Sequence, residues 1–180
     1  NDIIRKMTQR FHQGDLKQKR KVLRYFMDLK HKTLNAINIE DLLLAIEQHL
    51  ETEQDDNVLI TNSLVVLCAY YKHIAIQMIE DINKHHPIKF DLKKETVDLE
   101  LVQNSDISAY IDAKPILKHH LARLQKIRET ITSAIRKHRL YESHDIYVIK
   151  WASQIDNYLS NQSNIPEALS KMEKADIASQ

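Results

Sequence analysis

The stretch DDNVLITNSLVVLCAYYKHIAIQMIEDI, residues 55 to 82, decides the fold of the chain. Its middle, residues 64 to 71, is an unbroken apolar run with polar residues on both sides. A helix on a protein surface shows an apolar stripe, whereas a helix that is apolar on all sides is buried. The run is much shorter than the roughly 20 apolar residues that cross a bilayer. We therefore predict a central core helix, capped at Asp55 or Asp56, and no membrane span.

The composition favours helices in the rest of the chain. The 180 residues include one glycine and three prolines, and strand-rich folds or phosphate-binding loops need more glycine for their turns. We expect a mainly α-helical bundle that forms one compact unit. The single cysteine, Cys68, lies in the apolar run, which predicts a packed, inert thiol and an intracellular protein of the cytoplasm or nucleus. Because the chain begins at Asn1 and not at methionine, we expect part of a longer protein.

Residues 1 to 86 are predicted to form an N-terminal helical bundle. Apolar residues recur at helical spacing over residues 2 to 13, and Gly14 is typical of a helix end. Asp15 can then cap a second helix, and Asn38 a third that follows a short turn. The third helix has an apolar face formed by Leu42, Leu43, Ala45, Ile46 and Leu50.

After Pro87, which ends the central helix, the spacing of the apolar residues changes. Apolar and polar residues alternate over 88 to 92 and again over 97 to 102, which is the period of a β-strand. We predict a short β-hairpin within a connector of residues 87 to 104. The turn between the strands has no glycine or asparagine for the tightest hairpin types, and a helix is the alternative.

Residues 105 to 160 are predicted to form a long αα-hairpin, and residues 161 to 180 a linker and a terminal helix. Ser105 or Asp106 can cap a short leading helix, and Pro115 suits the first turn of a long one. This long helix has an apolar stripe made up of Leu117, Leu121, Leu124, Ile127, Ile131, Ala134, Ile135 and His138. A narrow stripe packs against neighbouring helices of the same chain, or against a second copy in a homodimer.

Basic residues are concentrated on two predicted helices, although the net charge is only +1. They lie opposite the apolar positions over residues 17 to 24, and over 114 to 139 Glu129 is the only acid. We predict a surface that binds another protein, formed by Lys17, Arg20, Lys21, Arg24, Leu117, Leu124, Ile131 and His138. Its cations would attract an acidic partner. The alternatives are nucleic-acid binding by both basic faces, or solvated faces that attract the acidic segment 40 to 56 of the same chain.

One part of the chain resembles a known family of helical domains. The resemblance rests on Leu23, Phe26, Met27 and Leu29, then Lys32-Thr33-Leu34, then Ile39 to His49, then Leu59 to Lys72. Over residues 15 to 72 this order is similar to the N-terminal domain of the elongation factor TFIIS and to the related integrase-binding domain of LEDGF. The resemblance implies a domain that docks short disordered motifs of transcription or chromatin proteins in a helical groove. It implies no catalytic residues.

The sequence contains no motif that indicates catalysis, a cofactor or a metal. His85-His86 and His119-His120 are adjacent pairs, and adjacent residues of a helix point about 100° apart, so neither pair suits a metal ion. Walker, dinucleotide-binding, HExxH and CxxC motifs are missing. We therefore expect a non-catalytic helical interaction module, an adaptor, regulator or scaffold part, without a cofactor. A small helical enzyme without a recognisable motif is the second alternative.

Overall fold

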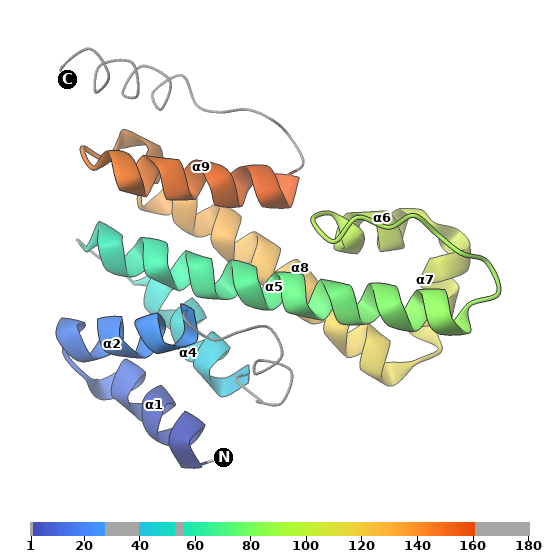
Figure 1. Ribbon diagram of the computed structural model, residues 1–180, viewed down its shortest axis with the longest axis horizontal. Helices are drawn as coiled ribbons and strands as arrows, with labels where there is room; N and C mark the ends of the chain where they lie inside the picture. The colour runs from blue at the N-terminus through green and yellow to red at the C-terminus, as the bar shows by residue number, and fades with distance from the viewer. Residues whose placement is uncertain (1, 28–39, 53–55, 161–180) are drawn as a thin grey trace.

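Helix α5, Asn57–His85, runs through the middle of the fold, as its apolar sequence predicts (Figure 1). It begins at Asp56, whose carboxylate accepts a hydrogen bond of 3.0 Å from the backbone N–H of Leu59. It ends two residues before Pro87 and is continuous between these points. Thirteen of its residues are buried, so the other helices must cover more than one of its faces.

The computed structural model describes residues 2–27, 40–52 and 56–160. Within these ranges the chain forms eight α-helices and one 3-10 helix, and it forms no strand. The predicted mainly α-helical class is confirmed. The predicted cap at Asn38 and the predicted linker and helix of residues 161 to 180 lie outside the described residues.

Helices α1 (Asp2–Gln13), α2 (Leu16–Met27) and α4 (Glu40–Glu51) cover one side of α5 (Figure 1). Helix α2 packs directly on α5, and α1 packs against both α2 and α4. A reciprocal pair of hydrogen bonds begins α2. The carboxylate of Asp15 accepts from the N–H of Gln18 at 2.9 Å, and the Gln18 amide oxygen accepts from the N–H of Asp15 at 3.1 Å.

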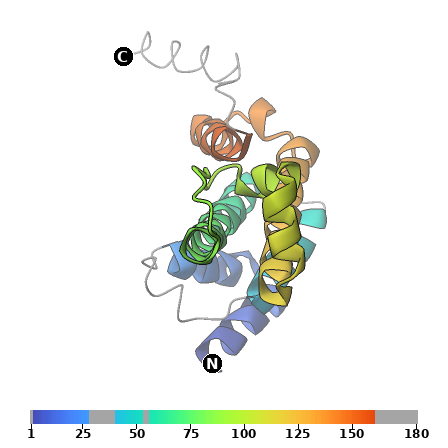
Figure 2. The ribbon, with the colours of Figure 1, turned by 90° about the vertical axis from the view of Figure 1, so that its right-hand side faces the viewer.

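Helices α8 (Pro115–Lys137) and α9 (Ile146–Ser160) cover the rest of α5, and the 3-10 helix η1 (Leu140–Glu142) joins them. The view along α5 shows α8 beside it and α9 on the side away from α2 (Figure 2). Although α9 follows α8 in the chain, it makes more contact with α5 than with α8. The core is therefore organised around α5.

The β-hairpin predicted at 88 to 102 is wrong. Residues 97 to 103 form helix α6 (Val97–Gln103), and residues 88 to 93 form an irregular connection. Val97 and Leu101 are four residues apart and fully buried, which is the helical period, whereas the side chain of Leu99 is 42% exposed. The alternating pattern over these few residues fits both periods, and packing on α5 and α8 selects the helix.

Helix α7 (Ser105–Asp112) follows α6 after a single residue, Asn104. The predicted cap at Ser105 or Asp106 is wrong, because the Asn104 side chain caps the helix. It accepts from the N–H groups of Asp106 at 3.1 Å and of Ile107 at 3.2 Å. Helices α6 and α7 form a corner at the far end of α5 (Figure 1), so the connector of residues 87 to 104 is part of the packed structure.

By length and composition alone, α5 could cross a membrane. Its most apolar window of 18 residues has a mean hydropathy of 1.4, and 61% of that window is buried inside the protein. The unbroken run at 64 to 71 is shorter than this window because further apolar residues, separated by polar ones, continue to Ile82. In this fold the apolar surface of α5 is covered by α2, α8 and α9.

Cys68 lies on α5 and packs against the core with only partial exposure. Burial raises the pKa of its thiol from 9.0 to about 11, and Lys72 opposes this shift. We expect the folded protein to react about a hundredfold more slowly with iodoacetamide near neutral pH than the chain in denaturant, because the thiolate is the nucleophile. The two alkylation rates, measured by mass spectrometry, test this. Equal rates would show that Cys68 is an accessible thiol of ordinary pKa.

Candidate binding surface on helices α1 and α2

The first two helices carry many positive charges and few negative ones. Residues 3 to 27 contain eight lysines and arginines and one acid, Asp15. Lys17, Lys21 and Arg24 follow one another at spacings of four and three residues, and all three are exposed. Such spacings place side chains on the same side of a helix. The structure therefore brings three of the four predicted cations of α2 together as a ridge that faces solvent.

Arg20, the fourth predicted cation, has a different environment. Its guanidinium pairs with the carboxylate of Asp56, which also caps α5. The Arg20 side chain remains 50% exposed, so this contact links α2 to the beginning of α5 without removing the charge from the surface. An exposed pair of this kind contributes little to stability.

Two acidic residues of α4, Glu40 and Glu47, face α8. Glu47 and Arg123 form an ion pair of 2.7 Å with both side chains buried, and Glu40 lies 3.4 Å from the His119 ring. Within the described ranges no ion pair joins α4 to α2, so the ridge of Lys17, Lys21 and Arg24 keeps its charge. The predicted attraction between the basic faces and the acidic segment 40 to 56 thus exists for α4 and α8, and on α2 it is limited, among the described residues, to the pair of Arg20 with Asp56.

A cleft with an apolar floor separates α1 from α2 beside this ridge. It has a volume of about 360 Å³ and is lined by Met7, Arg10, Gln18, Lys21, Val22 and Tyr25. Val22 is buried and forms the floor, whereas the Tyr25 ring is 39% exposed. Arg10 from α1 and Lys21 from α2 are exposed cations on the rim, and no carboxylate lines the cleft.

A shallower polar hollow continues from this cleft toward the turn between the two helices. It is lined by Lys6, Gln9, Arg10, Gln13, Gly14 and Gln18, so Arg10 and Gln18 belong to both depressions. Its other side chains are amides and one more cation, Lys6. The two depressions together form one continuous surface that is apolar at one end, polar at the other and cationic throughout.

The four residues predicted on α8 lie apart from this surface. Leu117 is 2% exposed, and Leu124 and Ile131 are fully buried in the core. The Nε2 atom of the half-buried His138 ring lies 2.9 Å from the backbone oxygen of Leu50, at the end of α4. The stripe therefore packs within its own chain. Periodicity identified the apolar stripe, but it could not tell whether α5 or a second chain covers it.

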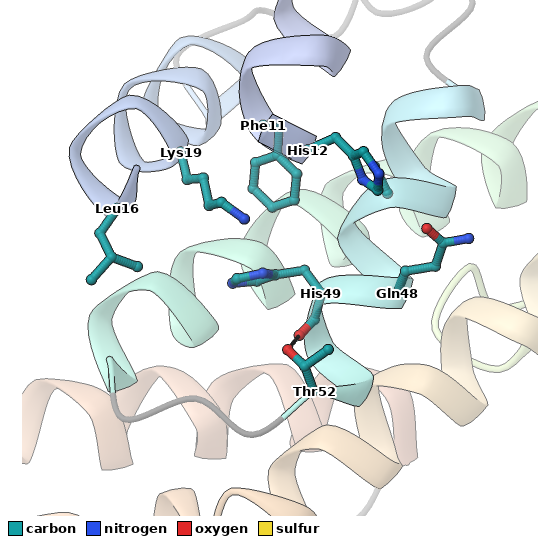
Figure 3. Close-up of a pocket in the computed structure, with 8 residues that line it drawn as sticks. Phe11, His12, Leu16, Lys19, Gln48, His49 and Thr52 are labelled. Atoms are coloured by element: carbon teal, nitrogen blue, oxygen red, sulfur yellow. Dashed lines mark hydrogen bonds between the residues drawn. The ribbon is translucent and has the colours of Figure 1, made fainter. Parts of the chain in front are cut away.

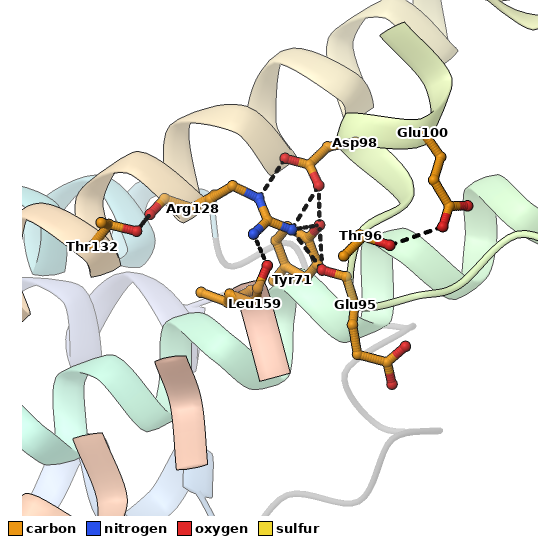
Figure 4. Close-up of polar contacts among 8 residues, drawn as sticks. All are labelled: Tyr71, Glu95, Thr96, Asp98, Glu100, Arg128, Thr132 and Leu159. Carbon is orange, nitrogen blue, oxygen red and sulfur yellow. Dashed lines mark hydrogen bonds and ion pairs between the residues drawn. The ribbon is translucent and has the colours of Figure 1, made fainter. Parts of the chain in front are cut away.

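A buried polar network joins four helices, and sequence reasoning missed it (Figure 4). All three guanidinium nitrogens of Arg128 donate hydrogen bonds. They go to Asp98 at 2.7 and 2.8 Å, to the Tyr71 hydroxyl at 2.8 Å, to the Glu95 backbone oxygen at 2.5 Å and to the Leu159 backbone oxygen. Asp98 is 1% exposed.

The arrangement of this network indicates a structural role. The Tyr71 hydroxyl donates to Asp98, and burial, followed by the neighbouring Asp98, raises the pKa of Tyr71. Tyr71 therefore stays a neutral donor, and Asp98 accepts from both Tyr71 and Arg128, whose three guanidinium nitrogens all donate. Neither Asp98 nor Arg128 stands out in the sequence, because charged residues adjacent to apolar ones are common in amphipathic helices.

Within the described part of the chain, no three His, Cys, Asp or Glu side chains are grouped so that they could hold a metal ion. Comparison of the chain with protein-family models, with curated proteins and with solved structures gives no match. The resemblance to the TFIIS and LEDGF domains stays a prediction, and the function has to be argued from the surface itself.

Proposed function

We propose that this protein is a non-catalytic docking module, and that the α1–α2 surface binds an acidic segment of a partner protein. The cleft between Arg10 and Lys21 carries the proposal, because it places an apolar floor between two cations that have no acidic partner within the described residues. An aliphatic or aromatic side chain of the partner would lie on Val22 and Tyr25. Carboxylates on either side of this anchor would contact the two cations.

The engagement of the cations on α8 favours a protein partner over a nucleic acid. Arg123 pairs with Glu47, Arg128 is held in the buried network, and the Lys137 ammonium donates to the backbone oxygen of Glu51. The second basic face that nucleic-acid binding was expected to use is therefore partly occupied within the chain. On α1 and α2, Arg10 and Lys21 flank an apolar cleft, which suits a side-chain anchor better than a phosphate backbone.

The cellular setting is part of the same proposal. The resemblance to the TFIIS and LEDGF domains implies transcription or chromatin, where an intracellular adaptor or scaffold part of this kind would act. Steering by the ridge of Lys17, Lys21 and Arg24 would speed the approach of an acidic partner, and this contribution would fall as salt screens it.

Charge reversal in the cleft tests the proposal. The probe is a fluorescent peptide of aspartates and glutamates with one central tryptophan, and its binding is measured by fluorescence anisotropy. We expect Arg10→Glu combined with Lys21→Glu to weaken binding by about tenfold or more at low salt, because each change replaces an attraction with a repulsion. The matched control is Lys126→Glu combined with Arg136→Glu, two exposed positions on α8, which should bind as the unaltered protein does.

Two further probes distinguish the outcomes. Replacing the tryptophan of the peptide with serine should weaken binding, because the apolar floor then has no anchor. A single-stranded oligonucleotide of equal charge should bind more weakly than the tryptophan peptide. Equal binding of the tryptophan and serine peptides, or tighter binding of the oligonucleotide, would overturn the docking proposal and favour nucleic acid.

A further inference from the structure

A second cavity lies between α1, α2 and α4, and it shares no residue with the cleft described above (Figure 3). Its volume is about 480 Å³, which is within the usual size range of small-molecule sites. The apolar part of its wall consists of the buried Phe11 and Ala45, together with Leu16, whose side chain is 49% exposed.

The side chains that line this cavity include a cation and no anion. Lys19 points into the space between Phe11 and His49 in Figure 3, and its ammonium lies 5.5 Å from the centre of the Phe11 ring. His12 and His49 also line the cavity, and no carboxylate does. The Phe11 and His49 rings meet edge to face, with their centroids 5.4 Å apart. The cavity thus combines an aromatic wall with one permanent cation.

We infer that this cavity binds a small organic carboxylate with an apolar aryl or alkyl body. The body would pack on Phe11 and Leu16, and the carboxylate would accept a hydrogen bond from the Lys19 ammonium. A neutral apolar ligand would remove the Lys19 ammonium from water without supplying a hydrogen-bond acceptor, and this desolvation costs free energy. A cationic ligand would be repelled by Lys19. The inference does not rest on the docking proposal, because the two sites use different residues.

His49 gives this site a dependence on pH. Burial, followed by the nearby Lys19 and His138, lowers the pKa of His49 to about 4, and Asp56 opposes this shift. The other titratable side chains that line the cavity are His12 and Lys19. The ring of His49 is therefore neutral near pH 7. A bound carboxylate favours its protonated form and raises its pKa, so by linkage the carboxylate binds more tightly as the pH falls.

The test uses 3-phenylpropionate as the probe and its amide, 3-phenylpropionamide, as the neutral control, with binding followed by NMR shifts of the protein. We expect saturable binding of the carboxylate that perturbs Phe11 and His49, and weaker binding of the amide. Lys19→Met should weaken carboxylate binding by about ten- to a hundredfold, the usual range for a lost hydrogen bond to a charged group. Lys17→Met, at an exposed position on the same helix, should leave it unchanged.

The pH arm of the experiment compares about pH 7 with about pH 5.5, where the probe is still largely ionised. The unaltered protein should bind the carboxylate more tightly at the lower pH, and His49→Phe, which keeps an aromatic ring at this position, should lose that increase. Equal binding of the carboxylate and the amide to the unaltered protein would overturn the inference. The inference would also be overturned if neither probe showed saturable binding. Equal affinity of Lys19→Met and Lys17→Met for the carboxylate would overturn it as well.

Discussion

Leu124→Asp is expected to abolish the cooperative unfolding transition of the protein. Leu124 is fully buried where α8 packs on α5, and a buried carboxylate without a partner costs several kcal/mol. Domains of this size have a free energy of unfolding of only about 5–15 kcal/mol. The milder Leu124→Ala should lower that free energy by about 2–5 kcal/mol, because it leaves a cavity. Urea titration followed by circular dichroism measures both variants.

The neighbouring residue provides the control. Gln125 is exposed on the same helix, so Gln125→Asp should change the free energy of unfolding by less than about 0.5 kcal/mol. Leu124→Asp and Gln125→Asp together distinguish an α8 stripe that packs in the core from one that is accessible to a partner. If Leu124→Asp had native helix content and native stability, the stripe would be an accessible surface for a partner or a second copy, and the packing described above would be incorrect.

Arg128→Met is expected to lower the free energy of unfolding by about 3–5 kcal/mol, the usual result of removing one member of a buried ion pair. The methionine fills part of the space of the arginine, but it leaves the carboxylate of Asp98 buried without its cation. The Glu95 and Leu159 backbone oxygens lose a donor as well. Chemical denaturation of the variant and of the unaltered protein gives the difference.

A double-mutant cycle shows whether this loss arises from the network. Arg128→Met combined with Asp98→Leu should be less destabilising than the sum of the two single changes, because no buried charge is then left without a partner. Arg136→Met, at an exposed position of α8, controls for the loss of an arginine alone. A loss for Arg128→Met no larger than that for Arg136→Met would show that the network does not stabilise the fold.

The parts of the fold that were predicted from the sequence are those with strong local signals. The apolar run at 64 to 71 predicts a core helix and forms part of α5, where Leu64, Val66, Leu67 and Tyr71 are buried and Ala69 is exposed. Gly14 and Asp15 mark a helix end and a helix cap by their own chemistry, and the structure has both. Over residues 97 to 102 the local signal is ambiguous, and α6 is helical because Val97 and Leu101 pack on other helices.

The candidate site could be predicted only in part, for a related reason. The spacing of Lys17, Lys21 and Arg24 gives the basic ridge from the sequence alone. The cleft beside it depends on how closely α1 lies against α2, and the charge of the ridge depends on which helix the acids of α4 face. Both are properties of tertiary packing. A count of charges cannot reveal that Glu47 faces Arg123, or that Arg20 is the cation of α2 that pairs with an acid of the segment 40 to 56.

The position of the Arg128 network also has a mechanical consequence. Arg128 donates a hydrogen bond to the backbone oxygen of Leu159, next to Ser160, the last described residue of α9. A pulling force applied to the chain beyond residue 160 therefore acts first on this contact, and through Arg128 on α5, α6 and α8 together. The last described turn of α9 can separate from the core only after the hydrogen bond between Arg128 and Leu159 breaks. The network therefore resists tension from the C-terminal side.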